Sequence, residues 1–195
     1  PLFSNLMFQG SKNCQPDAHS SMISVVGGRV NAYTTDDVTV FWETVPAQYL
    51  PLILWLEADR MASLRIDTHT FERERQVVKE ERRMRVDNQP YGSLTEVIYD
   101  QAFTVHPYKH TTIGSMADLD AASVEDVRDF YRTFYVPGNA TIAPVGDFDP
   151  KQAMALTTRY LWAVPGSEPP NPAGQPAAAE AEADSRGARA RGRAG

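Results

Sequence analysis

Two glutamates on one predicted helix have a spacing that suggests chemistry. The segment 71–84 reads FERERQVVKEERRM, lacks Gly and Pro, and consists mainly of residues that favour helix. Glu74 and Glu81 are seven residues apart, and seven residues at 3.6 per turn return within roughly 20° of the starting direction. We therefore expect both carboxylates to point to the same side of the helix. Its apolar stripe would come from Phe71, Val77, Val78 and Met84.

Several sequence blocks resemble those of the pitrilysin/insulinase-type zinc metallopeptidases, the inverted zincins. They are LMFQGS at 6–11, GGRVNAYT at 27–34, LWLEADRM at 54–61, ERQVVKEE at 74–81 and VGDFDP at 145–150. This family carries HxxEH on a helix just before the LMFQGS-like turn and takes its third zinc ligand from a downstream Glu. The resemblance implies that Glu81 matches that ligand and that Glu74 matches a second acidic position supporting the zinc site.

The five residues before LMFQGS depart from the family motif, because HxxEH is replaced by PLFSN. Pro1 and Asn5 stand at the two zinc-ligand histidines, and Ser4 stands at the catalytic glutamate. A proline offers no ligand atom on its side chain, and a neutral amide oxygen is a poor zinc ligand. Serine cannot act as a carboxylate base. We therefore expect no zinc in this chain, with Glu81 the only retained ligand and no catalytic residue retained.

The predicted strand containing Asn31, Ala32 and Tyr33 matches the family's substrate-binding edge strand. The resemblance implies that an extended peptide adds to this edge as a further β-strand. The motif is intact here. The alternative is that the strand serves the fold alone.

Three functional hypotheses follow from these residues. The first is a non-catalytic homologue that binds an extended peptide or pairs with a catalytically intact homologous subunit. The second is an active zinc metalloendopeptidase whose site is completed elsewhere. The third is a non-functional gene fragment. The substitutions at Pro1, Ser4 and Asn5 favour the first and third hypotheses over the second.

The predicted fold class is α+β, an antiparallel-rich sheet with helices packed mainly on one face. The resemblance implies one half of a two-half metallopeptidase fold in residues 1–165, beginning after the family's first strands. Residues 166–195 are rich in Pro, Ala, Gly and Arg, and we expect a disordered tail there because such a segment buries too little apolar surface. Helices are expected at 1–8, 18–26, 47–64, 71–84, 91–103, 123–135 and 151–162, and strands at 29–35, 38–45 and 139–145.

Composition excludes some classes of function. The 195 residues carry a net charge of −6, which argues against a nucleic-acid partner. No run approaches the roughly 18 apolar residues of a membrane helix, so no membrane segment is predicted. The single cysteine, Cys14, excludes an internal disulfide and leaves a periplasmic or a cytoplasmic location open.

Overall fold

The computed structural model describes residues 1–162, 164 and 166, and these form two compact units. Unit 1 holds the described residues of 1–34, 38–74 and 122–166, and unit 2 holds residues 35–37 and 75–121. Each unit is described by itself below. The predicted tail, apart from Gly166, lies outside the described residues.

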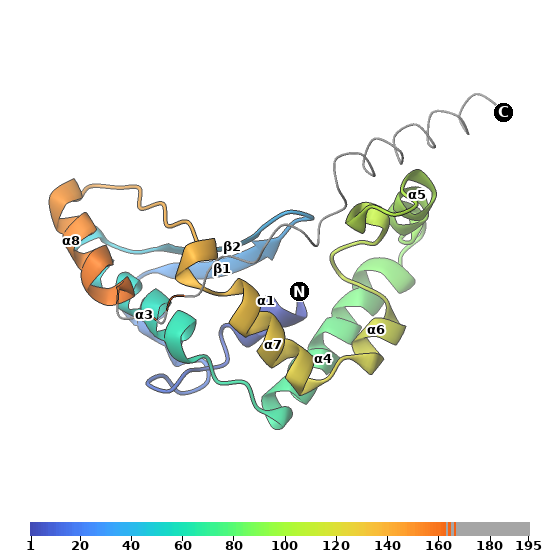
Figure 1. The fold of residues 1–195 in the computed structure, drawn as a ribbon, viewed down its shortest axis with the longest axis horizontal. Helices are drawn as coiled ribbons and strands as arrows, with labels where there is room; N and C mark the ends of the chain where they lie inside the picture. Colours follow the sequence, from blue (N-terminus) through green and yellow to red (C-terminus); the bar gives the residue numbers. More distant parts are fainter. Residues whose placement is uncertain (163, 165, 167–195) are drawn as a thin grey trace. The chain divides into compact units, whose positions relative to one another are not determined.

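Unit 1 contains most of the secondary structure (Figure 1). Its elements are α1 (Leu2–Leu6), α2 (Ala18–Val25), β1 (Arg29–Thr34), β2 (Thr39–Thr44), η1 (Ala47–Tyr49), α3 (Leu50–Ser63), α7 (Val124–Phe134), η4 (Pro137–Asn139) and α8 (Pro150–Leu161). The helix α4 (Thr68–Arg82) begins in unit 1 and ends in unit 2. Unit 2 continues with η2 (Arg83–Asp87), α5 (Leu94–Ala102), η3 (Pro107–Lys109) and α6 (Met116–Ala121).

The sheet is an antiparallel hairpin of β1 and β2, whose register runs from Arg29 opposite Thr44 to Thr34 opposite Thr39. Because side chains alternate along a strand, Val30, Ala32 and Thr34 share one half-buried face, and Asn31 and Tyr33 lie on the exposed face. The helices α1 and α2 contact β1. Val30, on the half-buried face, packs against the apolar cluster that contains Ile23 of α2 and Leu56 of α3.

The predicted strand at 139–145 is wrong. This segment follows the 3-10 helix η4 and forms no strand, and Ile142 and Val145 are exposed. Pro144 contributes to this outcome because proline lacks the N–H that a sheet ladder needs. Among the described residues the sheet has two strands, so the fold is mixed α/β but mostly helical rather than rich in strands.

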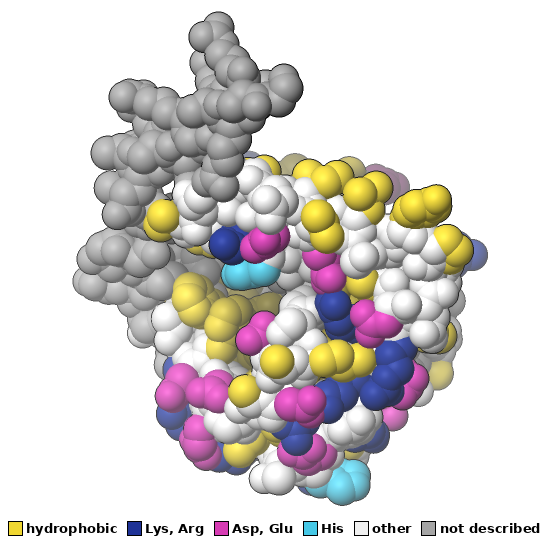
Figure 2. All heavy atoms as spheres, turned by 90° about the vertical axis from the view of Figure 1, so that its right-hand side faces the viewer, with side chains coloured by type: hydrophobic (Ala, Val, Ile, Leu, Met, Phe, Trp, Pro, Cys, Tyr) yellow, Lys and Arg dark blue, Asp and Glu magenta, His cyan; other side chains and the backbone are white. Residues whose placement is uncertain are grey.

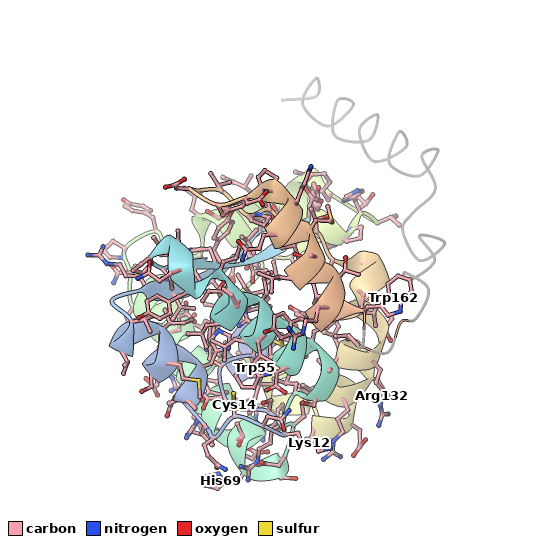
Figure 3. The ribbon with its side chains drawn as sticks, turned by 90° about the vertical axis from the view of Figure 1, so that its left-hand side faces the viewer. Lys12, Cys14, Trp55, His69, Arg132 and Trp162 are labelled. Atoms are coloured by element: carbon pink, nitrogen blue, oxygen red, sulfur yellow. The ribbon has the colours of Figure 1, made fainter. Side chains whose placement is uncertain are left out.

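Two apolar clusters hold unit 1 together. In the first, Leu6 of α1 packs against Phe71 of α4 and Val127 of α7. In the second, Cys14 packs against Ile23 of α2 and Leu56 of α3. Figure 3 shows Cys14 beside Trp55, and Trp162 and Arg132 projecting outward. These clusters fix α1, α2, α3 and α7 around the hairpin.

The helix α4 has a narrower apolar stripe than predicted. Phe71 and Val78 are buried, whereas Val77 and Met84 are 48% and 61% exposed. Phe71 and Val78 lie on one line along the helix because they are seven residues apart, while Val77 points about 100° away from Val78. Met84 lies beyond α4, in the π-helical turn η2.

Side chains cap the starts of two helices. The Thr70 N–H donates to Asp67 Oδ1 at 2.8 Å, and this bond lowers the pKa of the Asp67 carboxyl. At the start of α7, Ser123 and Asp126 form a reciprocal capping box. In contrast, α6 lies where the sequence indicated no helix.

Unit 2 is organised around Arg82 at the end of α4. Its guanidinium donates to Glu96 Oε2 of α5 at 3.0 Å and to the Gly114 carbonyl at 2.6 Å. The Thr111 hydroxyl donates to the same Glu96 carboxylate at 3.3 Å. Arg82 lowers the pKa of Glu96 by this hydrogen bonding, and the contacts fix α5 and the 111–114 loop to α4.

The described surface is of mixed charge. Figure 2 shows basic and acidic side chains next to one another on the face that it draws. Within the described residues, no helix combines the length and apolar character that crossing a bilayer requires.

Candidate functional site

The positions predicted for the family motif are Pro1, at the N-cap of α1, and Ser4 and Asn5 within this helix of five residues. Ser4 Oγ donates to the Pro1 carbonyl at 2.7 Å, and the Asn5 N–H donates to the same carbonyl at 3.0 Å. Leu6, next to Asn5, is fully buried. The helix is thus held by its apolar side, and Ser4 and Asn5 are only partly exposed.

The turn after α1 is bound to α3 by a polar network. Ser11 Oγ donates to Asp59 Oδ2, and Asn13 Nδ2 donates to Asp59 Oδ1 at 2.6 Å. Ser11 Oγ also accepts the Cys14 N–H at 2.9 Å. Gly10 has φ +99°, and a Cβ there would lie 2.8 Å from the Cys14 carbonyl oxygen, so the turn requires glycine.

Glu74 is buried and ion-paired in unit 1. Its carboxylate lies 3.1 Å from Arg73 Nε, and Arg73 also donates to the Gln9 side chain in the turn after α1. Glu74 therefore belongs to a polar chain between α4 and the segment that follows the motif. Residues that support the ligands of a metal site are hydrogen-bonded in this way, but the assignment of Glu74 to that role stays a prediction.

Glu81 lies two turns further along α4, in unit 2. Its Oε1 is 2.7 Å from Arg85 Nη1, and its side chain is 21% exposed. Because Pro1, Ser4 and Asn5 belong to unit 1, their approach to Glu81 stays a prediction.

Zinc does not fit the groups present at the family's ligand positions. Zinc sites use imidazole, thiolate and carboxylate ligands, usually three or four from the protein. Asn5 supplies an amide, Ser4 a hydroxyl that is bonded to a backbone carbonyl, and Glu81 a carboxylate paired with Arg85. No step of a zinc-dependent reaction follows from these groups.

The strand β1 has an unpaired outer edge among the described residues, since its partner there is β2. The Ala32 N–H donates to Asn31 Oδ1 at 2.8 Å, which indicates that this N–H points away from β2. In an antiparallel pair, alternate residues direct their backbone groups outward. Val30, Ala32 and Thr34 would then present N–H and C=O groups to the free edge.

The structure also brings together four polar side chains that the sequence reasoning missed. His19 of α2, Glu43 of β2, and Glu57 and Arg60 of α3 meet beneath the hairpin. The Arg60 guanidinium lies over the Phe41 and Phe8 rings, 4.5 Å and 5.2 Å from their centres, in cation–π geometry. We name this set the polar cluster.

The polar cluster contains ligand types that bind metals, but it is not assigned as a metal site. The ligand atoms of His19, Glu43 and Glu57 lie within 4.8 Å of one another. However, Arg60 Nη2 is 3.2 Å from Glu43 Oε1 and is bonded to Glu57 as well. The guanidinium already supplies the positive charge between the carboxylates, and a metal ion would have to displace it.

Part of the polar cluster had a signal in the sequence. Glu57 and Arg60 are three residues apart on a predicted helix, a spacing that places them side by side. His19 and Glu43 are distant in sequence from both, so only the tertiary fold brings them together. A glutamate on the inward-facing side of a predicted strand was the available indication for Glu43, which lies opposite Val30.

The chain matches two family models. Residues 2–116 match the model described as Insulinase (Peptidase family M16), and residues 121–186 match the model described as Peptidase M16 inactive domain.

The chain is also similar to individual proteins. The zinc protease PqqE of Helicobacter pylori is 33% identical over 160 residues, which cover 82% of this chain and 36% of that protein. The mitochondrial-processing peptidase subunit beta of Saccharomyces cerevisiae is 25% identical over 175 residues, 88% of this chain and 37% of that protein. The crystal structure of a protease from Helicobacter pylori superposes with a TM-score of 0.83 at 32% identity, covering 86% of this chain and 40% of that one. The chain spans little more than a third of the length of the first two relatives.

Proposed function

Because this chain belongs to the insulinase family of peptidases, M16, we propose that it is a non-catalytic member that binds an extended peptide along β1. The observation that carries this proposal is the replacement of the family's HxxEH by PLFSN beside an intact edge strand. Pro1, Ser4 and Asn5 stand at the two ligands and the base. The family is one of zinc proteases, and in this chain we expect neither zinc nor peptide cleavage.

The loss of activity follows from the number of ligands. A catalytic zinc is held by three protein ligands and activates a water in an open position. Of the family's three ligands, Glu81 alone remains. Without Glu at position 4 the proton transfer from that water is lost as well, a factor of roughly 10²–10⁴.

The peptide-binding proposal is supported by the outer edge of β1. Backbone donors and acceptors on an unpaired edge bind an extended chain by adding a strand. The Ala32 N–H has only the neighbouring Asn31 side chain as partner on that side, and an incoming peptide carbonyl would replace this bond. Tyr33, 53% exposed on the outer face, would contact the side chains of the bound peptide.

A pair of variants at Ala32 tests this proposal. Ala32→Pro removes the N–H from the outer edge, and Ala32→Val keeps it while adding two methyl groups to the inner face. We expect fluorescence anisotropy with a labelled, unstructured peptide to show binding by the unmodified chain and by Ala32→Val. Ala32→Pro should weaken it about tenfold, since one lost hydrogen bond and the ring's steric clash add together. Equal binding by the two variants, or no binding by the unmodified chain, would contradict the proposal.

A second candidate function is that of a partner subunit for a catalytically intact homologue. The observation favouring it is the match to a relative that is itself named as a subunit, the mitochondrial-processing peptidase subunit beta. The test is to mix the chain with an M16 protein from the same organism that carries an intact HxxEH. Co-elution on a sizing column together with faster peptide cleavage would support a partner role. Separate elution with unchanged cleavage would contradict it and leave peptide binding by β1 as the function to test.

A further inference from the structure

The polar cluster joins three elements of unit 1 through close contacts. His19 Nε2 of α2 lies 3.4 Å from Glu43 Oε1 of β2 and 3.9 Å from Glu57 Oε1 of α3. Arg60 Nε donates to Glu57 Oε2 at 3.0 Å, and Arg60 Nη2 lies 3.2 Å from Glu43 Oε1. The side chains of His19, Arg60 and Glu43 are 4%, 3% and 7% exposed. The Arg60–Glu43 contact between α3 and the hairpin therefore lies out of water, while the side chain of Glu57 is 22% exposed.

The charges of the polar cluster balance only if it holds one proton. Arg60 is a permanent cation, and the two carboxylates are close enough to contact the same guanidinium nitrogen. If His19 is neutral and both carboxylates are ionised, the buried net charge is −1. One added proton brings the net charge to zero, whether it sits on the carboxylate pair or on His19 Nε2.

Burial decides between these two positions of the proton. Burial, and after it the charge of Arg60, lower the pKa of His19 to about 4. Loss of solvent raises the pKa of Glu57 to about 7 against the opposing charge of Arg60, helped by the hydrogen bond with Glu43. The proton therefore sits on Glu57, which is hydrogen-bonded to Glu43, and the imidazole is neutral.

We propose that His19, Glu43, Glu57 and Arg60 form a proton-sharing cluster that makes the docking of the β1–β2 hairpin on α3 dependent on pH. With the proton in place, Glu43 and Glu57 share a hydrogen bond. After its release, one guanidinium faces two carboxylates, one on β2 and one on α3. Their repulsion acts directly across the contact between the hairpin and the helix, and it weakens that contact.

Among the described residues, the groups facing this cluster do not supply a second cation. His19 comes from α2 and Glu43 from β2, and the other charged or titratable side chains there are Glu57, Asp59 and Arg60 of α3 and Tyr135 after α7. Asp59 is held by Ser11 and Asn13 and adds negative charge. Release of the shared proton is therefore not compensated locally.

The pH dependence has a defined sign. The raised pKa of Glu57, about 7 against 4.5, gives stability that is full below pH 4.5 and is lost as pH rises through 7. The lowered pKa of His19, about 4 against 6.5, gives stability that is full above pH 6.5 and is lost as pH falls through 4. Between 4.5 and 6.5 the two trends cancel, because folding moves a proton from His19 to Glu57. The net loss of docking should appear as pH rises from 6.5 to above 7.

The test measures amide hydrogen-exchange protection in β1 and β2 between pH 5 and 8, corrected for intrinsic exchange. In the unmodified chain we expect protection to be level from pH 5 to 6 and then to fall about threefold between pH 6 and 8, because only the half unit between the unfolded pKa of His19 and the folded pKa of Glu57 is not cancelled. Glu57→Gln should remove this fall, and His19→Asn should extend it down to about pH 5. Asp129→Asn, at an exposed carboxylate of α7, serves as the matched control and should leave the profile unchanged.

A measurement on the unmodified chain keeps the proposal testable if a variant fails to fold. The ¹⁵N shifts of the His19 ring should report a neutral imidazole from pH 8 down to about pH 5. A His19 ring that is protonated at pH 6, or a Glu57→Gln chain that keeps the alkaline fall, would overturn the proposal. Neither readout depends on peptide binding, so its failure and the failure of the proposed function are distinguishable.

Discussion

The polar cluster and the predicted zinc position are two groups of residues that differ in the contacts their members make. In the polar cluster, every charged group has a partner of opposite charge, and three elements depend on the contacts. At the predicted zinc position, Ser4 and Asn5 donate to the backbone carbonyl of Pro1 within a single short helix. The first set joins three elements of the fold, and the second makes contacts only within α1.

The position of α1 depends on Leu6, which packs against Phe71 and Val127. We therefore expect α1 to tolerate changes at Ser4 and Asn5. In contrast, the polar cluster cannot lose one member cheaply, because a buried charge would remain without its partner. Substitutions should therefore have unequal effects in the two sets.

The largest effect is expected for Arg60→Met. Methionine fills similar volume but leaves the Glu43 and Glu57 carboxylates without a cation, at a cost of about 3–5 kcal/mol. The loss should be smaller at pH 5, which lies below the raised pKa of Glu57, so that this carboxyl carries a proton. Urea unfolding at pH 7.5 and pH 5 measures it, with Arg132→Met as control because the Arg132–Asp129 pair is exposed. Equal effects of the two substitutions would show that the cluster contributes nothing to stability.

An intermediate effect is expected for Glu74→Gln. Glu74 is buried, but its partner Arg73 is 46% exposed and returns to water when the charge is removed. Glutamine keeps a hydrogen-bond acceptor at the same place, so we expect a loss of about 1 kcal/mol. The midpoint of urea unfolding reports this value. A loss as large as that of Arg60→Met would place Glu74 among the groups on which the fold depends.

The smallest effect is expected for Glu81→Gln. Glu81 pairs with Arg85, which is 73% exposed, and pairs of this kind contribute less than about 0.5 kcal/mol. The same unfolding measurement should place this variant with the unmodified chain. A clear increase in the free energy of unfolding would instead indicate that Glu81 destabilises the fold, as functional residues often do.

Local signals in the sequence predicted most helices and both strands of the hairpin. Caps, turns and periodicity depend on neighbouring residues, as the local hydrogen bonds of Asp67 and Ser123 at two helix starts illustrate. The prediction of a strand at 139–145 was wrong because a strand forms only by hydrogen bonding to a neighbouring strand. Pro144 lacks the backbone N–H that such bonding requires. The exposure of Val77 was not predicted because Phe71 and Val78, and likewise Val77 and Met84, are seven residues apart. Each pair forms a line along the helix, and only the packing of the folded chain decides which line is buried.

Only those parts of the candidate site that lie in continuous sequence motifs could be predicted. The blocks around Glu81 and Asn31 lie in continuous segments, so their resemblance to the family is readable directly. The polar cluster joins residues from 19 to 60 across three elements, and no local pattern contains it. Tertiary proximity was the missing information.

Metal analysis of the purified chain tests the central claim most directly, beside the triple variant Pro1→His, Ser4→Glu, Asn5→His. The account predicts less than about one-tenth of an equivalent of zinc in the unmodified chain and no chelator-sensitive cleavage of a fluorogenic peptide, because zinc sites need three or four protein ligands. Zinc uptake by the triple variant alone would show that Glu81 stands where the restored ligands need it. Near-equimolar zinc together with chelator-sensitive cleavage in the unmodified chain would contradict the account.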